Sequence, residues 1–466
     1  MRRIVWWARR DLRLTDNLTL HSALRDAASV IPVFILDPKL WQSRKLAPAR
    51  RQFLCDALAD LDAQLRERGA RLIVREGEPA RELERVVNET QADAVYFHRD
   101  FTPFARQRDA RVIAALAKLG ARVETFDDNY LAAPEQIAKD DGAPYVVFTR
   151  FRLRFEERVG LPMRFSARGD FGVPPEIASN DLPRVTRDPR VARGGETVGA
   201  KLARAFVRRD DGLRAYAATR NDLARDATSH LSPHLHFGTV SVRELVRAAR
   251  AADAGQPGKA WLDELVWREF YMHVLYHFPH AARGAFKREY AALPWENDRA
   301  TFAAWCEGLT GYPVVDAALR QLNETGWMHN RARMIVASFL TKDLLIDWRW
   351  GEKYFLQNLV DGDVAANNGG WQWAASTGTD AQPFFRIFNP VLQGARFDAS
   401  GAYVRRWLPE LGRVPTKYLH APWTMPADIA RQAGITLGKT YPAPMVEHAL
   451  QRERALRLYR KQKSEG

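Results

Sequence analysis

Residues 361–373, DGDVAANNGGWQW, bring acids, amides, glycines and two tryptophans into one short run. The acids and amides would each cost free energy if they were buried without a partner, so a polar group must meet them. Trp371 and Trp373 add flat aromatic surface beside these polar groups. Such a combination suits a heterocyclic cofactor, a nucleobase or both. The alternative is a surface loop of caps and turns, and apolar periodicity is too weak to predict a buried helix or strand here.

A second run, Thr228–Ser232, places three hydroxyl side chains within five residues, before Pro233 and a helical segment that starts near Ser241. Hydroxyls and exposed backbone amides at the start of a helix bind anions well, because the unbonded N–H groups and the helix dipole act together. The alternative is an N-cap with nothing bound. The spacing therefore indicates a candidate phosphate site.

Two helical segments carry further polar and aromatic faces. In residues 262–271, Glu264, Trp267 and Tyr271 share one face, which is either a binding surface or a solvated charge beside a core aromatic. Residues 327–334 are expected to be helical throughout. Their i, i+3, i+7 spacing gathers Trp327, Asn330 and Met334, with Arg331 beside them and Arg333 pointing elsewhere.

Alternating strands and helices in the first part of the chain must position these groups. Short buried strands are expected at Ile4–Trp7, Val30–Leu36, Arg71–Val74, Ala94–Phe97 and Arg122–Phe126. Helical spacing with charged outer faces fills Ala49–Arg68, Ala80–Glu89 and Ala105–Leu119. This alternation predicts a parallel sheet with helices on both faces. The glycine fingerprint of dinucleotide-binding folds does not follow the first strand.

The rest of the chain changes character twice. Residues 131–195 are rich in proline and are expected to form a long surface connector, not a third domain. From Thr197 onward the apolar period is helical, and Gln451–Gly466 is expected to be a basic helix or a frayed tail. We therefore expect three parts: residues 1–130, the connector 131–195, and a helical domain 196–466.

Bulk properties narrow the class of protein. A chain of 466 residues with 46% hydrophobic residues is large enough for two cores. Its net charge of +14 favours a polyanionic partner, most simply nucleic acid, although a membrane surface is also compatible. Cys55 and Cys306 match no metal or redox motif, and no stretch of sequence resembles a signal peptide or a membrane span. We expect a cytoplasmic protein without a metal site.

The run 361–390 resembles the flavin and active-site segment of the DNA photolyase/cryptochrome family, and Trp7–Asn17 is similar to that family's N-terminal motif. Ala8 departs from that motif, where phenylalanine or histidine is more usual. Among the branches of this family, the chain is most similar to the bacterial class I cyclobutane pyrimidine dimer photolyases. The resemblance covers nearly the whole chain. It implies a Rossmann-like α/β antenna domain joined by a long loop to an all-α FAD domain.

The resemblance also assigns roles at the flavin. It implies that Arg333 pairs with Asp361 near the flavin ring, that Asp363 accepts from the flavin N3–H, and that Asn367 lies at N5. An amide at this last position favours repair over signalling, because plant cryptochromes typically carry Asp there and animal cryptochromes Cys. The full set of expected FAD contacts is Tyr216, Thr228, Ser229, Leu231, Ser232, Asn330, Arg333, Asp361, Asp363 and Asn367.

Lesion contacts and an electron relay follow from the same resemblance. Glu264 is expected to hydrogen-bond the pyrimidine edge, and Trp267 and Trp373 to form aromatic walls, with Arg331 holding phosphate. The full lesion and DNA set is Glu264, Trp267, Asn330, Arg331, Met334 and Trp373. Trp371, Trp348 and Trp295 match the family's electron-relaying tryptophans, and the alternative for these three is ordinary core packing. The implied reaction is light-driven reversal of cyclobutane pyrimidine dimers in DNA by reduced FAD, in a monomer without an obligate protein partner.

Other functions stay open at this stage. A (6-4) photolyase uses two histidines at the positions of Asn330 and Met334, and a cryptochrome photoreceptor often has a longer C-terminal tail than this chain offers. A light-independent nucleic-acid-binding protein leaves the flavin residues unexplained.

A second, antenna chromophore is also implied. Deazaflavin is preferred over methenyltetrahydrofolate, because residues 36–38 and 47–51 look like the deazaflavin-binding branch. The candidate contacts are Arg9, Asp37 and Asp100.

Overall fold

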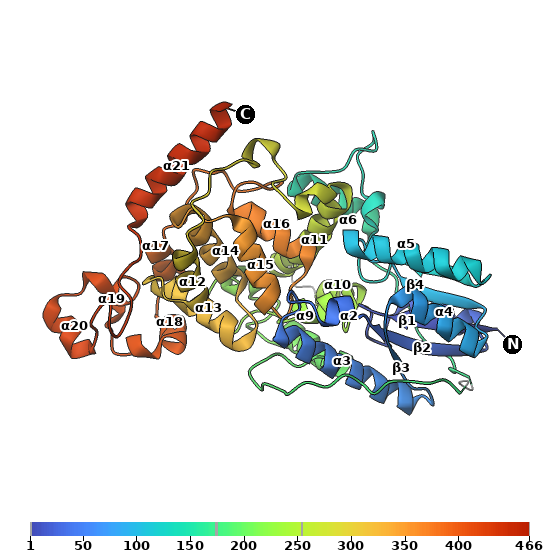
Figure 1. The fold of residues 1–466 in the computed structure, drawn as a ribbon. Coiled ribbons are helices and arrows are strands. Elements are labelled where there is room, and N and C mark those ends of the chain that lie inside the picture. Colours follow the sequence, from blue (N-terminus) through green and yellow to red (C-terminus); the bar gives the residue numbers. More distant parts are fainter. Residues whose placement is uncertain (1, 173–175, 253–254, 466) are drawn as a thin grey trace. The chain divides into compact units, whose positions relative to one another are not determined.

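The computed structural model describes residues 2–172, 176–252 and 255–465 (Figure 1). The chain forms two compact units. The first comprises Met1–Ala217, Thr228–Pro279 and Val360–Ala365, and the second comprises Ala218–Ala227, His280–Leu359 and Ala366–Gly466. The expected boundaries at residues 130 and 195 stay a prediction.

The first unit is built on a five-stranded parallel sheet with the strand order β3-β2-β1-β4-β5. The strands are β1 (Arg3–Ala8), β2 (Ser29–Leu36), β3 (Ile73–Glu76), β4 (Ala94–His98) and β5 (Arg122–Phe126). The register pairs Val5 with Ile31 on one side and with Val95 on the other. The expected parallel sheet is therefore confirmed. Strands β1, β2 and β4 are buried, as their near-continuous apolar runs predict, but the prediction of burial is wrong for the edge strand β5, whose residues are exposed or half-buried.

Helices cover both faces of this sheet. Helices α4 (Pro79–Thr90) and α5 (Pro103–Lys118) bury their apolar faces against the side of β1 that carries Val5 and Trp7. On the other face lies α1 (Leu18–Asp26), which the sequence did not predict. Asn17 caps this helix by accepting from the Leu20 backbone N–H, and Tyr96 of β4 donates to Asp26 at its end. Helix α3 (Pro48–Glu67) completes the predicted set.

The connector contains more structure than expected. Residues 148–159 form α6 (Phe148–Val159), which packs on the long helix α11 (Gly255–His277). Between them in the chain lie α7 (Glu196–Arg208), α8 (Tyr216–Thr219), α9 (Ser232–Phe237) and α10 (Val242–Ala251). Ser241 caps α10, but the hydroxyl run ends at the separate, six-residue α9.

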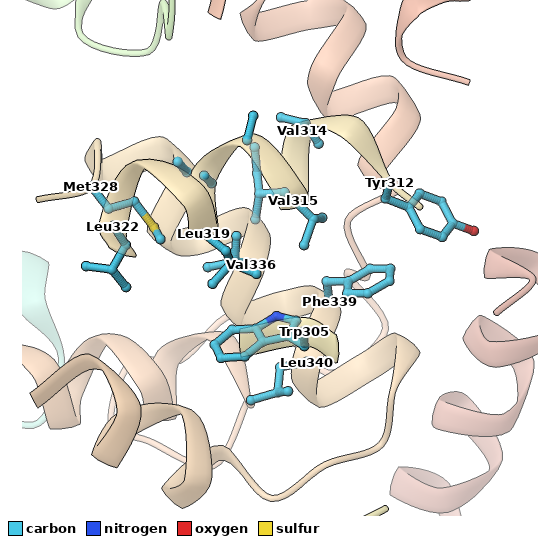
Figure 2. Close-up of a cluster of buried hydrophobic side chains, with 14 of the residues drawn as sticks. Trp305, Tyr312, Val314, Val315, Leu319, Leu322, Met328, Val336, Phe339 and Leu340 are labelled. Atoms are coloured by element: carbon cyan, nitrogen blue, oxygen red, sulfur yellow. The ribbon is translucent and has the colours of Figure 1, made fainter. Parts of the chain in front are cut away.

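The second unit is helical. Its main helices are α12 (Arg299–Glu307), α13 (Pro313–Thr325), α14 (Asn330–Ser338), α15 (Trp348–Asn358), α16 (Val364–Ala374, from Ala366), α17 (Pro390–Phe397), α18 (Ala402–Trp407), α20 (Ala427–Ala433) and α21 (His448–Glu465). A π-helical turn, η4 (Phe339–Asp343), continues α14. Figure 2 shows the core, where α13 and α14 bury Val315, Leu319 and Val336 around Trp305. The basic C-terminal helix is confirmed.

Two local predictions are wrong. The run 361–373 is not free of regular structure, because α16 occupies most of it and buries Asn368, Trp371 and Gln372. Helix α14 begins at Asn330, so Trp327 lies outside it and does not share its face by helical spacing. His329 caps α14 by accepting from the Arg331 backbone N–H, which fixes where that helix starts.

Candidate functional site

In the first unit, a largely buried ion pair holds Asp363. One carboxylate oxygen of Asp363 accepts from the Arg10 guanidinium at 2.7 Å, and the other accepts from the Ala365 backbone N–H at 3.0 Å. Arg10, two residues beyond β1, also donates to the His236 carbonyl oxygen at 2.7 Å. Burial alone would raise the pKa of Asp363, but Arg10 and then His236 outweigh it and hold that pKa well below 3.8. Asp363 is therefore an anionic acceptor at neutral pH.

Asp361 has a different hydrogen-bond partner. The Ser232 hydroxyl donates to it at 2.6 Å. Between the two acids, a Cβ on Gly362 would overlap the guanidinium of Arg50, which comes from α3. Burial lowers the pKa of Arg50 to about 10, although Asp361 and Asp363 act in the opposite direction, so Arg50 stays charged at neutral pH. The acids thus stand beside buried cations that the sequence did not connect with them.

Only some of the hydroxyl groups in residues 228–232 form hydrogen bonds within the protein. Ser232 is bonded to Asp361, and the Ser229 hydroxyl accepts weakly from the Leu231 N–H at 3.5 Å. The Thr228 hydroxyl oxygen is buried and has no hydrogen-bond partner within residues 2–172, 176–252 and 255–465. A buried hydroxyl in this state costs free energy, and a bound phosphate oxygen or ribose group would satisfy it. Of the predicted phosphate contacts, Thr228 therefore fits the cofactor best.

The remaining FAD candidates of this unit lie in its apolar core. Tyr216 starts α8 and makes an edge-to-face contact with Phe206, at 6.0 Å between ring centroids. Leu231 is buried in the same cluster.

The predicted lesion face of α11 is aromatic. Trp267 and Tyr271 are neighbours at 5.4 Å between ring centroids, and Glu264 is half-buried one turn before Trp267. The ring of Trp267 also stacks on Phe148 of α6, with centroids 3.6 Å apart and planes 5° from parallel. Sequence reasoning missed Phe148, because the connector gave no sign that it folds onto α11.

In the second unit, α14 presents its candidates at its first turns. Arg331 donates twice to the Asn221 side-chain oxygen, at 2.7 and 3.0 Å, and its guanidinium lies over the Phe397 ring. Arg333 donates to the Met328 carbonyl oxygen at 2.8 Å. Asn330 is exposed and Met334 half-buried. The expected pair of Arg333 with Asp361 joins residues of different units and stays a prediction.

Helix α16 orients its amides through hydrogen bonds. The Asn367 amide nitrogen donates to the Glu352 carbonyl oxygen of α15 at 3.0 Å, which leaves the amide oxygen as the available acceptor. An acceptor is what the protonated N5 of a reduced flavin requires, so this orientation fits the predicted role. Asn368 and Gln372 instead serve the fold, since both donate to the Ala281 carbonyl oxygen at 3.0 Å.

The three relay tryptophans belong to one apolar cluster of the second unit. Trp371 and Trp348 are 2% and 3% exposed, and Trp295 is partly exposed and packs against the same cluster. Trp371 lies so close to Gly351 of α15 that a Cβ there would overlap its ring. Trp305, which the sequence did not single out, makes an edge-to-face contact with Trp371 at 6.2 Å. Trp373, the other aromatic of α16, is partly buried.

The antenna candidates already have partners inside the chain. Arg9 pairs with Asp109 at 2.6 Å and lies over the Trp7 ring. Asp100 accepts from the Thr102 N–H and lies 3.6 Å from Arg10.

The third candidate, Asp37, caps α2 (Pro38–Trp41) by accepting from the Lys39 N–H. All three follow the carboxyl ends of strands, where ligands of such sheets bind. Their antenna role stays a prediction.

Three further observations concern the whole of the described chain. Within residues 2–172, 176–252 and 255–465, no group of three His, Cys, Asp or Glu side chains is arranged to hold a metal ion. The same ranges contain no helix whose length and hydropathy would let it cross a bilayer. Both cysteines are free thiols.

One unit with a Rossmann-like parallel sheet and the candidate acids, and a second, helical unit with oriented amides and an aromatic cluster, are typical of a two-domain flavoprotein. Two family models match the chain: "DNA photolyase" over residues 4–167 and "FAD binding domain of DNA photolyase" over residues 261–461. The chain belongs to the DNA photolyase family and carries its FAD-binding domain.

Individual relatives are similar to this chain along almost its full length. The deoxyribodipyrimidine photo-lyase of Synechococcus sp. is 42% identical, covering 99% of this chain and 97% of its own. A class III photolyase structure from Agrobacterium tumefaciens has a TM-score of 0.91 at 38% identity, covering 100% of this chain and 98% of its own. A Synechocystis sp. cryptochrome structure has a TM-score of 0.89 at 31% identity, covering 98% and 99%. The expected class I placement within the family therefore stays a prediction.

The residues that sequence reasoning missed share one property. Arg10, Arg50, His236, Phe148 and Trp305 act on candidate residues far away in sequence. The one sequence feature that could have indicated such a residue is the basic run 47–51, which includes Arg50. The sequence analysis assigned that run to the antenna site instead.

Proposed function

We propose that the protein repairs cyclobutane pyrimidine dimers in DNA in a light-dependent reaction that uses bound, reduced FAD. The curated relative from Synechococcus sp. carries the name of this activity at 42% identity over 99% of the chain. The observation that carries the proposal for this chain is the orientation of Asn367, whose amide oxygen is left to accept from a protonated flavin N5. The chemistry that bound FAD supplies is transfer of one electron to the dimer and its return after the ring opens.

The residues of the chain bind and orient. In the first unit, Asp363 stays ionised beside Arg10 and accepts from the flavin N3–H, and Thr228 bonds the phosphate portion. In the second unit, Asn367 accepts at N5, and Arg333 is a further candidate contact of the flavin. These roles need no nucleophile and no general base, because the difficult step belongs to the cofactor.

The proposed lesion contacts also come from both units. In the first unit, Glu264 bonds the pyrimidine edge and Trp267 packs on the bases. In the second, Trp373 supplies an aromatic wall and Arg331 holds phosphate, together with Asn330 and Met334. A dimer must leave the base stack to reach such groups, and a damaged pair loses less stacking energy when it does so.

The lesion assignment is tested with variants that keep the flavin. Glu264→Ala and Trp267→Ala are expected to weaken binding and repair of a dimer-containing oligonucleotide while the bound FAD stays stoichiometric. Glu264→Gln is the matched control, because it keeps a hydrogen-bonding side chain of the same size and one acceptor oxygen, while it removes the charge and replaces the other oxygen by an amide donor. Loss of FAD from both alanine variants would show that these residues act on the cofactor, and the assignment would fail.

A second candidate function is blue-light reception, as in cryptochromes. It is favoured by the structural likeness to the Synechocystis cryptochrome. Asn367 argues for repair, and the repair assay separates the two. A third activity, (6-4) photolyase repair, is disfavoured because Asn330 and Met334 stand where (6-4) photolyases carry histidines.

The deazaflavin-type antenna, the monomeric state and the cytoplasmic location also remain predictions.

A further inference from the structure

Helix α6 carries one buried aromatic stripe. Phe148, Phe151 and Phe155 recur at i, i+3 and i+7 and are 8%, 1% and 4% exposed. The stripe packs against α11, the helix that carries Trp267. Phe151, for example, contacts Phe270 at 5.3 Å between ring centroids. A segment of the connector is thus part of the core beneath the proposed lesion face.

The contact between Phe148 and Trp267 differs from the others in geometry. Their ring centroids are 3.6 Å apart and their planes 5° from parallel, so Phe148 covers one face of the indole. Phe270 meets both rings edge-on, at 5.8 Å from Phe148 and 5.7 Å from Trp267. Tyr271 lies against Trp267 at 5.4 Å. The indole is therefore backed on one face and flanked by two further rings.

Polar contacts hold α6 against α11 near this stack. Arg152, one turn beyond Phe148, lies 3.5 Å from the Asp263 carboxylate, one turn before Trp267. The Tyr145 backbone N–H donates to the His273 imidazole at 3.2 Å, and the other ring nitrogen of His273 lies 3.1 Å from the Pro134 carbonyl oxygen. Because both sides of the stack are tied in this way, Phe148 has little freedom to move away from the indole.

We infer that Phe148 is a positioning residue for lesion recognition: it fixes the plane of Trp267 so that the opposite indole face meets the bases of the dimer. This inference rests on the proposed function, since it assigns to Phe148 an effect that acts through Trp267. Phe148 is buried and does not itself offer a surface to DNA. An indole that is already ordered loses less side-chain freedom when a base stacks on it, which favours binding.

The test is a double-mutant cycle on the FAD-bound protein, measured as affinity for an oligonucleotide with one thymine dimer. Phe148→Leu removes the aromatic stack but keeps an apolar side chain, and it is expected to weaken lesion affinity about three- to tenfold. Phe148→Tyr keeps the ring and should restore affinity. Phe155→Leu is the matched control, because Phe155 lies two turns further along the same stripe and packs on Phe151.

The decisive comparison is made in a Trp267→Ala background. There Phe148→Leu should cost no further affinity, because nothing is left to position. An equal loss in both backgrounds, or an equal loss in Phe148→Leu and Phe155→Leu, would show a merely structural role and overturn the inference. A gain of affinity in Phe148→Leu would overturn it as well, since the ring would then occupy the place of a base.

Failure of the proposed function looks different. In that case the parent protein, with Phe148 intact, does not repair the dimer or discriminate it from undamaged DNA. Unfolding of Phe148→Leu is recognised by loss of the helical circular dichroism signal, and the same double-mutant cycle is then measured with Phe148→Met, which also removes the ring but fills more of its volume.

Discussion

The Asp363 carboxylate accepts from the Arg10 guanidinium at 2.7 Å, although the two residues are separated by 353 positions in the sequence. This pair ties the segment after β1 to the acids beside the proposed flavin contacts. It also explains why Asp363 is ionised in spite of its burial. The sheet and the candidate acids therefore belong to one folded unit.

Breaking this pair should destabilise the protein strongly. Arg10→Met leaves the Asp363 charge buried without its main partner, which costs about 3–5 kcal/mol in comparable cases. Chemical unfolding of the FAD-bound protein, followed by circular dichroism, measures the change. Arg25→Met is the control, because the pair of Arg25 with Asp26 is exposed and its loss should leave the midpoint unchanged. Equal midpoints for both variants and the parent would contradict this account.

Gly351 should be intolerant of a side chain. The Cβ of Gly351→Ala would overlap the Trp371 ring, and overpacking of this kind costs about 1–3 kcal/mol. The displaced indole should also slow photoreduction of oxidised flavin, which is followed by absorbance. Gly284→Ala is the control, since apart from its chain neighbours no described residue has an atom within 4 Å of its Cβ. Identical photoreduction rates in the two variants would show that Trp371 is not held by this contact.

The relay assignment makes a separate prediction. Trp295→Phe should block photoreduction of oxidised flavin, because phenylalanine is much harder to oxidise, but should spare repair by protein that was reduced beforehand. Trp407→Phe serves as control, being a partly buried tryptophan against the same core. If the pre-reduced Trp295→Phe protein failed to repair, the relay assignment would be wrong.

Glu269 should make stability depend on pH. Burial raises its pKa to about 7 from 4.5, although Arg268 and the backbone N–H groups of Leu131 and Ala132 act in the opposite direction. Because the folded-state pKa lies above the unfolded value, the stabilisation is complete below pH 4.5 and is lost as the pH rises through 7.

The variant Glu269→Gln keeps a carbonyl acceptor and removes the titration. Its free energy of unfolding, relative to the parent, should therefore be higher at pH 8 than at pH 5, by about 2–3 kcal/mol. Thermal or chemical unfolding of both proteins at the two pH values measures this difference. The same relative stability at both pH values would contradict the prediction.

The sequence predicted the sheet well and the polar helix badly, for a common physical reason. Most of β2 is a continuous apolar run, and this local pattern is enough to predict a buried strand of a parallel sheet. Helix α16 lacks an apolar stripe, and its burial depends on amides such as Asn368 and Gln372 that bond the distant Ala281 carbonyl oxygen. No local pattern reveals such a partner.

The candidate site follows the same division. Asp363, Asn367 and Trp267 could be selected from the sequence, because their types and their resemblance to a family are local properties. The groups that hold them, Arg10, Glu352 and Phe148, could not be selected, because each reaches its partner only through the fold.

The most direct test of the central claim is repair of an oligonucleotide that carries one defined cyclobutane thymine dimer. The protein is loaded with FAD, chemically reduced, and assayed under near-ultraviolet or blue light beside a dark control. We predict that the two thymines are restored in the light only. Protein that holds reduced FAD and binds the lesion, yet restores no thymine in the light, would contradict the account and favour a photoreceptor.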